Sequence, residues 1–426
     1  MDNLKKVSII LVVVFILNIC SCSFADNLSI VGEAAVLIDT DTGQILFQKN
    51  PHEKLYPAST TKIMTGILAI EEGNLDDLVT IDEEVLKNLD GNHIALEPGE
   101  QISLKDLLYA ALIESANDAA IAIGKHISGN YDSFISLMNE KAKEYGALNT
   151  NFTNPNGLPD ENHLTTAYDL AMIAKHAMEN ETFRNIVKSY TYTIQPTNIK
   201  KEARYLKSAN RLLYSNNKIE VDGKVVPIKY QGATGIKTGY THVAQQCLVS
   251  SASRGELNLI CVVLKSTGTN IYSDTHKLFN YGFNDFKRTN LAFKNEFIDT
   301  FPVKDGDLPY VTGIVDKDLK MNIPIDSKNE IERKVTIPED LRAPIKKGQV
   351  IGDIEFYLGG EKIGTSNIIS TMDINKKSPT LKFLFNKWII LLVILFIVWR
   401  ILAIIKKVKK KKRRKNRNHN FEAPIK

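Results

Sequence analysis

The chain has 426 residues, of which 43% are hydrophobic and 24% are charged. This composition is that of a globular protein and excludes a disordered or collagen-like chain, and the length predicts two or three folded units. The formal net charge is +5, but residues 26–399 hold 40 Lys and Arg against 47 Asp and Glu, a net charge of about −7. The bulk of the chain is therefore not expected to bind a polyanion such as nucleic acid.

Residues 1–25 have the pattern of a secretory signal peptide. Two lysines precede an apolar run at residues 7–19, and residues 23–25 provide a small-x-small cleavage site. The shortness of the apolar run disfavours the alternative of an uncleaved anchor. Lipoprotein processing at Cys20 or Cys22 is also disfavoured, because a bulky isoleucine precedes the first of them. We expect the mature chain to be exported.

A hairpin is predicted at residues 33–49, followed by an apolar helix at residues 62–72. Pro57 ends the preceding segment, so Ser59 is expected at the start of this buried helix. Ser59 and Lys62 are three residues apart and would share one helix face, where a lysine amine can take a proton from a serine hydroxyl. A helix N-terminus also favours a developing negative charge. Alone, this S-x-x-K pattern is weak, because most occurrences are surface residues of ordinary helices.

A mostly helical region follows at residues 75–181. Its predicted helices begin at Ser103, whose Asp106 occupies the capping-box position, at Ala119 and at Thr166. A loop rich in Asn, Pro and Gly spans residues 151–162 and separates the last two helices.

Three successive strands are predicted at residues 235–240, 246–253 and 257–264, with a closing helix at residues 273–281. Strands therefore begin and end this unit, and helices lie between them. This order favours an α+β domain over residues 26–284, with an antiparallel sheet, helices on both faces and a helical insert.

Two cysteines remain after the signal peptide, Cys247 and Cys261, on neighbouring predicted strands. A strained cross-strand disulfide is one interpretation. Two buried free thiols are the preferred one.

The C-terminal part changes character after residue 284. Residues 285–380 show period-2 patterns and turns, which predict a small β-rich domain without a catalytic constellation, acting as a spacer or contact surface. Residues 388–405 form an apolar run interrupted by Arg400, long enough to be a transmembrane helix. The basic tail at residues 406–426 marks the cytoplasmic side. We therefore expect a single-pass protein of the cell membrane, with its catalytic domain on the extracytoplasmic face.

Two further short motifs could complete a site with Ser59 and Lys62. Ser115 and Asn117 lie in a short link between helical runs, and Lys237 and Thr238 lie on a predicted strand followed by a glycine. Each motif alone is weak, since Ser115 could join helices by a hydrogen bond and Lys237 could be a solvated strand residue. Their order in an exported chain makes the combination strong, and such triplets occur in penicillin-binding proteins and class A β-lactamases.

The resemblance extends beyond these motifs, over residues 35–70, 96–129, 152–174 and 235–264. These segments resemble the D-alanyl-D-alanine carboxypeptidases among the low-molecular-weight penicillin-binding proteins (serine peptidase family S11, penicillin-binding protein 5-like). The resemblance implies the penicillin-binding/β-lactamase-like α+β fold. It also implies removal of the terminal D-alanine from peptidoglycan stem pentapeptides without a metal or other cofactor, and covalent binding of β-lactam antibiotics.

The resemblance also assigns the site. It implies a nucleophile, a lysine that activates it and a serine that assists proton transfer; these catalytic residues are Ser59, Lys62 and Ser115. It implies substrate binding by five others, which are Asn117, Lys237, Thr238, Gly239 and Tyr240. The backbone N–H groups of Ser59 and Tyr240 would form the oxyanion hole.

Several positions depart from the family pattern or have a structural interpretation. Tyr240 stands where some members have histidine, and Gln245 stands where glycine is usual. Ile271 stands where many relatives carry an arginine near the substrate carboxylate, which puts the strength of carboxylate binding in doubt. His163 and Asp169 match family positions, and we expect both to be structural supports.

Four alternatives remain open from the sequence. A β-lactamase of the same fold would need a carboxylate for deacylation, and Glu161 is the nearby candidate. A peptidoglycan DD-endopeptidase or a transpeptidase differs only in leaving group or acceptor. From another class, a non-catalytic wall-binding scaffold could retain the fold, although a scaffold has no need of Lys62.

Overall fold

The structure is a computed structural model that describes residues 28–87, 89–327, 330–377 and 381–418. The predicted signal peptide and the end of the basic tail lie outside the described residues. The chain divides into two compact units, of which the first contains most of the chain up to Leu291. The boundary predicted between residues 284 and 285 stays a prediction.

Five strands of the first unit form an antiparallel sheet in the order β2-β1-β11-β10-β9. They are β1 (Ala34–Asp39), β2 (Ile45–Lys49), β9 (Ala233–Thr241), β10 (Gln245–Arg254) and β11 (Leu257–Ser266). The first two are the predicted hairpin, and the last three are the predicted successive strands. Because β9 ends this order, it is an edge strand of the sheet.

Three two-stranded antiparallel ribbons accompany the sheet: β3 (Leu78–Thr80) with β4 (Gln101–Ser103), β5 (Thr191–Ile194) with β6 (Arg204–Lys207), and β7 (Lys218–Val221) with β8 (Lys224–Pro227). The α-helices are α2 (Lys62–Glu72), α3 (Leu104–Tyr109), α4 (Asn117–Ser128), α5 (Tyr131–Glu144), α6 (Ala167–Glu179), α7 (Glu181–Val187) and α8 (Asn270–Asp285). Shorter helical turns are η1 (Ala58–Thr61), η2 (Glu83–Leu86), η3 (Ala110–Glu114), a π-turn, and η4 (Arg211–Leu213).

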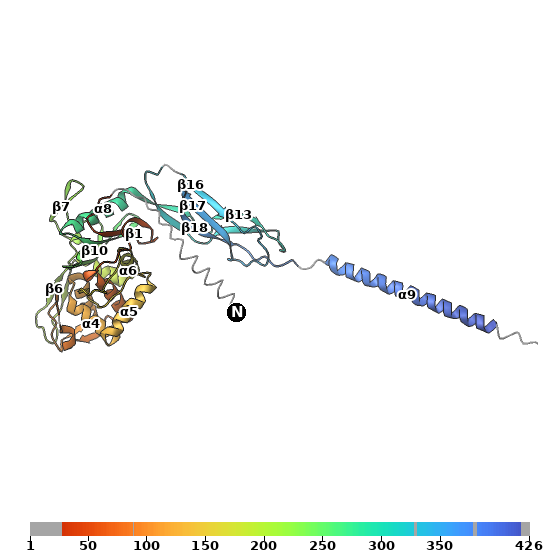
Figure 1. Cartoon of the computed structure of the whole chain (residues 1–426), viewed down its shortest axis with the longest axis horizontal. Helices are drawn as coiled ribbons and strands as arrows, with labels where there is room; N and C mark the ends of the chain where they lie inside the picture. The colour runs from red at the N-terminus through yellow and green to blue at the C-terminus, as the bar shows by residue number, and fades with distance from the viewer. Residues whose placement is uncertain (1–27, 88, 328–329, 378–380, 419–426) are drawn as a thin grey trace, which may run out of the picture. The chain divides into compact units, whose positions relative to one another are not determined.

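Apolar layers cover both faces of the five-stranded sheet. Along β11, Ile260 and Val262 belong to one buried cluster, while Cys261 and Val263 belong to the other. The first cluster includes helices α2, α4 and α6, and the second includes α8. Figure 1 shows α8 on one side of β1 and β10 and the larger group of helices on the other. The predicted sheet with helices on both faces and a helical insert is confirmed.

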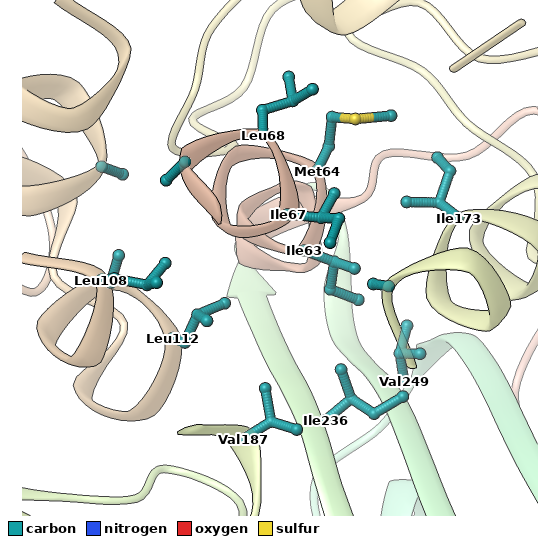
Figure 2. Close-up of a cluster of buried hydrophobic side chains, with 14 of the residues drawn as sticks. Ile63, Met64, Ile67, Leu68, Leu108, Leu112, Ile173, Val187, Ile236 and Val249 are labelled. Atoms are coloured by element: carbon teal, nitrogen blue, oxygen red, sulfur yellow. The ribbon is translucent and has the colours of Figure 1, made fainter. Parts of the chain in front are cut away.

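Helix α2 lies at the centre of the first cluster. Its side chains Ile63, Met64, Ile67 and Leu68 are all fully buried. Figure 2 shows them packed between residues of neighbouring helices and residues of the sheet. Burying a side chain of this size stabilises the fold by roughly 1.5–3 kcal/mol, so this helix is firmly held. The residue that begins it, Lys62, is held with it.

The C-terminal part is β-rich, as predicted. A five-stranded sheet has the order β13-β14-β18-β17-β16. Its strands are β13 (Phe297–Pro302), β14 (Tyr310–Val315), β16 (Ile331–Thr336), β17 (Val350–Leu358) and β18 (Glu361–Ser370), while β12 (Phe286–Ala292) pairs with β15 (Leu319–Pro324).

A single long helix, α9 (Leu381–Asn418), follows the β-rich part (Figure 1). Its segment Lys387–Arg414 is apolar enough to cross a membrane, with a mean hydropathy of 3.0 in its most apolar window. The 28 residues of this segment correspond to about 42 Å of helix, which exceeds the ~30 Å hydrocarbon core of a bilayer.

Candidate active site

Ser59 and Lys62 lie at the junction between a short turn and helix α2. Ser59 is in the 3-10 turn η1, and Lys62 is the first residue of the α-helix. The helix begins where it was predicted, Ser59 lies in the turn that leads into it, and the two side chains meet as expected. Lys62 Nζ lies 2.9 Å from Ser59 Oγ. The amine is thus in direct reach of the hydroxyl proton.

Lys62 is fully buried and has two further polar partners. Its Nζ donates to Asn117 Oδ1 at 2.6 Å and to the backbone carbonyl of Asn156 at 2.7 Å. Burial holds the pKa of Lys62 well below its usual value, the charge of Lys237 lowers it further, and Asp118 opposes the shift. A neutral amine has two N–H donors and one lone pair. In the neutral amine, donation to Asn117 and Asn156 would use both N–H groups and leave the lone pair facing Ser59.

The second motif lies where the π-turn η3 ends and helix α4 begins. Ser115 adopts a left-handed backbone with φ of 70° and is almost buried, with 7% of its surface exposed. Asn117 is the first residue of α4, and its Nδ2 donates to the Asp90 carbonyl at 2.5 Å. Because this bond fixes the amide, Asn117 Oδ1 is held towards Lys62.

The third motif lies on edge strand β9. Lys237 is buried, and burial lowers its pKa to about 7, with the carboxylate of Glu114 opposing the shift. Its Nζ donates to the Thr238 carbonyl at 2.9 Å. A Cβ atom added to Gly239 would lie 3.1 Å from the backbone nitrogen of Ser59. A side chain at this position would therefore push β9 and the serine turn apart by a few tenths of an ångström, and glycine leaves this contact unstrained.

Tyr240 follows this glycine and has a different environment. It is 61% exposed, beyond the point where β9 passes Ser59. An edge strand offers backbone N–H and C=O groups to a ligand that adds as a further strand. Tyr240 therefore stands where an extended ligand along β9 would pass.

One site residue has no counterpart among the sequence predictions. The carbonyl of Asn156 reaches Lys62 from the loop that was predicted between residues 151 and 162. Gly157 in the same loop has φ of 86° and packs against Ala58, so the loop passes directly over turn η1. The composition predicted a loop, but a backbone carbonyl carries no side-chain signal. By contrast, Glu161, the residue that a β-lactamase would require, is exposed.

Two of the three departures from the family pattern, Ile271 and Gln245, have different structural consequences. Ile271 is 2% exposed and packs in the second apolar cluster on helix α8, on the opposite side of the sheet from α2. The interpretation that Ile271 replaces a charge facing the substrate is therefore wrong for this chain. Gln245 has φ of 53°, a conformation that favours glycine, so the usual glycine would be less strained there.

Asp169 and His163, which we expected to be structural supports, both make hydrogen-bond contacts within the fold. Asp169 accepts hydrogen bonds from Asn149 N and Thr150 Oγ1 at 2.7 and 2.8 Å. His163 contacts Thr61, directly before Lys62.

A serine in reach of a buried lysine of lowered pKa, beneath a glycine-bearing edge strand, defines the class of serine acyl-transfer enzymes. The profile described as D-alanyl-D-alanine carboxypeptidase matches residues 22–268. The profile of the penicillin-binding protein 5 C-terminal domain matches residues 286–376. The chain belongs to the D-alanyl-D-alanine carboxypeptidase family.

Individual relatives agree with this assignment. The D-alanyl-D-alanine carboxypeptidase DacF of Bacillus subtilis is 32% identical over 392 residues, which cover 87% of this chain and 95% of the relative. DacC of Escherichia coli is 34% identical over 79% of this chain and 82% of its own. The crystal structure of penicillin-binding protein 5 from Haemophilus influenzae superposes with a TM-score of 0.71 at 30% identity, covering 83% of this chain and all of that one. The expected serine D-Ala-D-Ala carboxypeptidase activity is confirmed, and the alternative functions are not favoured.

Proposed function

We propose that Ser59 is the nucleophile of this carboxypeptidase and that neutral Lys62 is its general base. The observation that carries this proposal is the 2.9 Å contact between Lys62 Nζ and Ser59 Oγ, with the other two Nζ contacts made to acceptors. Ser59 Oγ attacks the carbonyl of the penultimate D-alanine and passes its proton to Lys62. The tetrahedral oxyanion is bound by the backbone N–H groups of Ser59 and Tyr240.

Breakdown of that intermediate completes the acylation. The C–N bond breaks, and the terminal D-alanine leaves after its nitrogen receives the proton from Lys62 through the hydroxyl of Ser115. The remaining peptide is an ester on Ser59. A water molecule then attacks this ester and passes a proton to Lys62. The bond between the acyl carbon and Ser59 Oγ breaks, Ser59 Oγ receives that proton back from Lys62, and the shortened peptide is released.

Four residues hold the substrate in this proposal. Asn117 binds the substrate amide, while Lys237 and Thr238 bind the terminal carboxylate. Gly239 leaves space for the peptide, which lies along the edge of β9 as an added strand. The carboxylate would also raise the charged fraction of Lys237, since an opposite charge favours the protonated amine.

The substrate we propose is the peptidoglycan stem pentapeptide ending in D-Ala-D-Ala, and β-lactams would acylate Ser59 in its place. We further propose a single-pass protein of the cell membrane. Helix α9 would be its anchor, residues 26–284 its extracytoplasmic catalytic domain, residues 285–380 a spacer, and residues 406–426 a cytoplasmic tail. The apolar run at residues 388–405, which lies within the candidate span Lys387–Arg414, and the basic residues that begin at Lys406 support this topology.

Two assays test the proposal. A fluorescent penicillin is expected to label the wild-type chain and not Ser59→Ala. Release of free D-alanine from a synthetic stem pentapeptide then distinguishes a carboxypeptidase from an endopeptidase, which would instead cleave a cross-linked dimer. Labelling of Ser59→Ala at the wild-type rate would place the nucleophile elsewhere, and an unlabelled wild type would favour a scaffold.

A further inference from the structure

His163 is a buried histidine that joins the loop over the active site to the segment that carries Lys62. Only 1% of its surface is exposed. Its Nε2 lies 2.8 Å from Thr61 Oγ1, and its Nδ1 lies 2.9 Å from the backbone nitrogen of Thr153. A backbone N–H can only donate, so Nδ1 is the acceptor. The ring proton is therefore on Nε2 and is donated to Thr61.

The surroundings of His163 keep this neutral tautomer. Burial lowers the pKa of His163 to about 4, and the negative charge of Asp160 opposes the shift. The ring of Phe152 covers it, with the ring centroids 5.7 Å apart. Thr153 Oγ1 also lies 3.2 Å from Nδ1. Protonation would place an N–H on Nδ1, facing the N–H of Thr153, so the backbone hydrogen bond from Thr153 requires the uncharged ring.

The loop that His163 fixes is the one that supplies the Asn156 carbonyl. Two backbone hydrogen bonds between Asn151 and Leu164 close the loop at its base. Away from this base, Thr65 Oγ1 donates to the Pro155 carbonyl at 2.6 Å. The contacts with Thr61, Lys62 and Thr65 thus all tie the loop to the beginning of helix α2. Thr61 is the residue directly before Lys62, so the His163 contact holds the backbone next to this lysine.

We propose that His163 is a positioning residue for the reaction: its neutral imidazole fixes the loop to Thr61 and so keeps the Asn156 carbonyl in place as an acceptor for Lys62. This inference rests on the proposed roles of Ser59 and Lys62. Without the Asn156 acceptor, the Lys62 amine is free to rotate, and its lone pair no longer points only to Ser59. A misplacement of about 1 Å in such a pair can cost on the order of 100-fold in rate.

Matched substitutions separate the two hydrogen bonds of His163, one with Thr61 and one with Thr153. In His163→Gln the side-chain amide can still donate to Thr61, whereas in His163→Asn the shorter side chain can only accept from Thr153. Thr61→Val removes the hydroxyl without changing the shape of the side chain. We expect His163→Asn and Thr61→Val each to lower the second-order rate of penicillin acylation roughly tenfold or more, and His163→Gln to stay within about threefold of the wild type.

The double variant adds a stricter requirement. If His163 acts through Thr61, then His163→Asn combined with Thr61→Val acylates no more slowly than the slower single variant. Independent losses that multiply would overturn the proposal. Thr65→Val serves as the comparison, because it removes a different side-chain tether of the loop and leaves His163 and Thr61 intact.

The pH dependence of acylation distinguishes positioning from a purely structural role. A loosened loop admits water to Lys62, whose low pKa is caused chiefly by burial, so the pKa of Lys62 rises. The acidic limb of the pH–rate profile of His163→Asn therefore moves to higher pH. A loss of folded protein alone would lower the rate at every pH and leave the midpoint unchanged, and that result would contradict the proposal.

The same experiment separates this inference from the proposed function. If wild type and Ser59→Ala are labelled alike, the nucleophile assignment fails. If Ser59 is labelled in the wild type but folded His163→Asn and Thr61→Val react at the wild-type rate, the positioning role fails and the nucleophile stands.

Discussion

Gly157 packs directly against the backbone of Ala58. A Cβ atom built on Gly157 would lie 1.9 Å from the Ala58 carbonyl oxygen, far inside any allowed contact. Gly157 also has φ of +86°, which side chains rarely adopt. Ala58 precedes Ser59, so the loop and the nucleophile turn are packed backbone to backbone.

This packing predicts a large effect for Gly157→Ala. The added methyl group must push the loop off turn η1, so we expect a loss of roughly 2–4 kcal/mol in the free energy of unfolding and a fall in acylation rate. Gly146→Ala is the matched control, because Gly146 has nearly the same φ of +88° and no atom within 4 Å of its added Cβ. Urea unfolding of both variants measures the difference. Equal losses in the two would mean that backbone strain alone, and not the contact with Ala58, is responsible.

The lowered pKa of Lys62 predicts that the acylation rate depends on pH. The amine must be neutral to accept the Ser59 proton, and burial holds its pKa well below the usual value. The rate is therefore expected to fall as pH falls through the folded-state pKa, because protonated Lys62 has no lone pair. Lys62→Met removes the base and should lower acylation by about 10²–10⁴-fold. Stopped-flow acylation from pH 5 to pH 10 tests both points, and a wild-type rate independent of pH would argue against Lys62 as the base.

The spacing of the motifs predicted much of the site, because that part of the site is built from side chains, and the sequence states which side chains are present. Ser59, Lys62 and Asn117 were expected to converge, and their side chains meet through hydrogen bonds of 2.9 and 2.6 Å. Their catalytic roles stay predictions. Asn156 could not be predicted, since any residue type offers the same backbone carbonyl. Its place depends on a loop path that local sequence patterns do not specify.

The local backbone conformation at the site could not be predicted from the sequence either. The apolar period in residues 62–72 predicted helix α2, but the 3-10 turn before it depends on packing against the loop at Gly157. Ser115 ends a π-turn in a left-handed conformation, which residues other than glycine rarely adopt and which no sequence pattern here predicts. At Ile271, the position in the chain suggested the substrate site, whereas the helix face places it in the core.

The burial of the Lys237 amine is expected to affect the stability of the protein as well as its activity. Its pKa is about 7 in the folded chain and near 10.5 when unfolded, so between these values the unfolded chain binds more protons. The cost of burying the charge is thus fully present below about pH 7 and disappears as pH rises to about 10.5. Lys237→Met should be more stable than the wild type at pH 6, by roughly 2–4 kcal/mol, with the gap closing by pH 10.5. It should also lose penicillin labelling.

Urea unfolding at pH 6, 8 and 10 measures this gap. Both proteins keep Lys62, and because the charge of Lys237 lowers the pKa of Lys62, the gap measures the contribution of Lys237 together with its effect on Lys62. A constant gap over this range would show that Lys237 keeps its charge in the folded chain.

The two cysteines should be inert in the folded protein. Cys247 and Cys261 are free and buried, as predicted, and they belong to different apolar clusters on opposite faces of the sheet. Burial raises the pKa of Cys247 to about 12, and burial also raises the pKa of Cys261. Because the thiolate is the reactive form, a chromogenic disulfide reagent should react with neither in the native state and with both in denaturant. Rapid reaction of either native thiol would contradict this burial.

These inert thiols make it possible to test the membrane topology with single introduced cysteines. Lys411→Cys lies in the basic stretch that follows the apolar run at residues 388–405, and Lys377→Cys lies before helix α9. With the tail inside, a membrane-impermeant maleimide should label intact cells at residue 377 and reach residue 411 only after permeabilisation, since basic residues flanking a span stay on the cytoplasmic side. Labelling of both in intact cells would mean that α9 does not cross the membrane. Deleting residues 381–426 should release a soluble chain that still binds penicillin, because every residue of the proposed site lies before that helix.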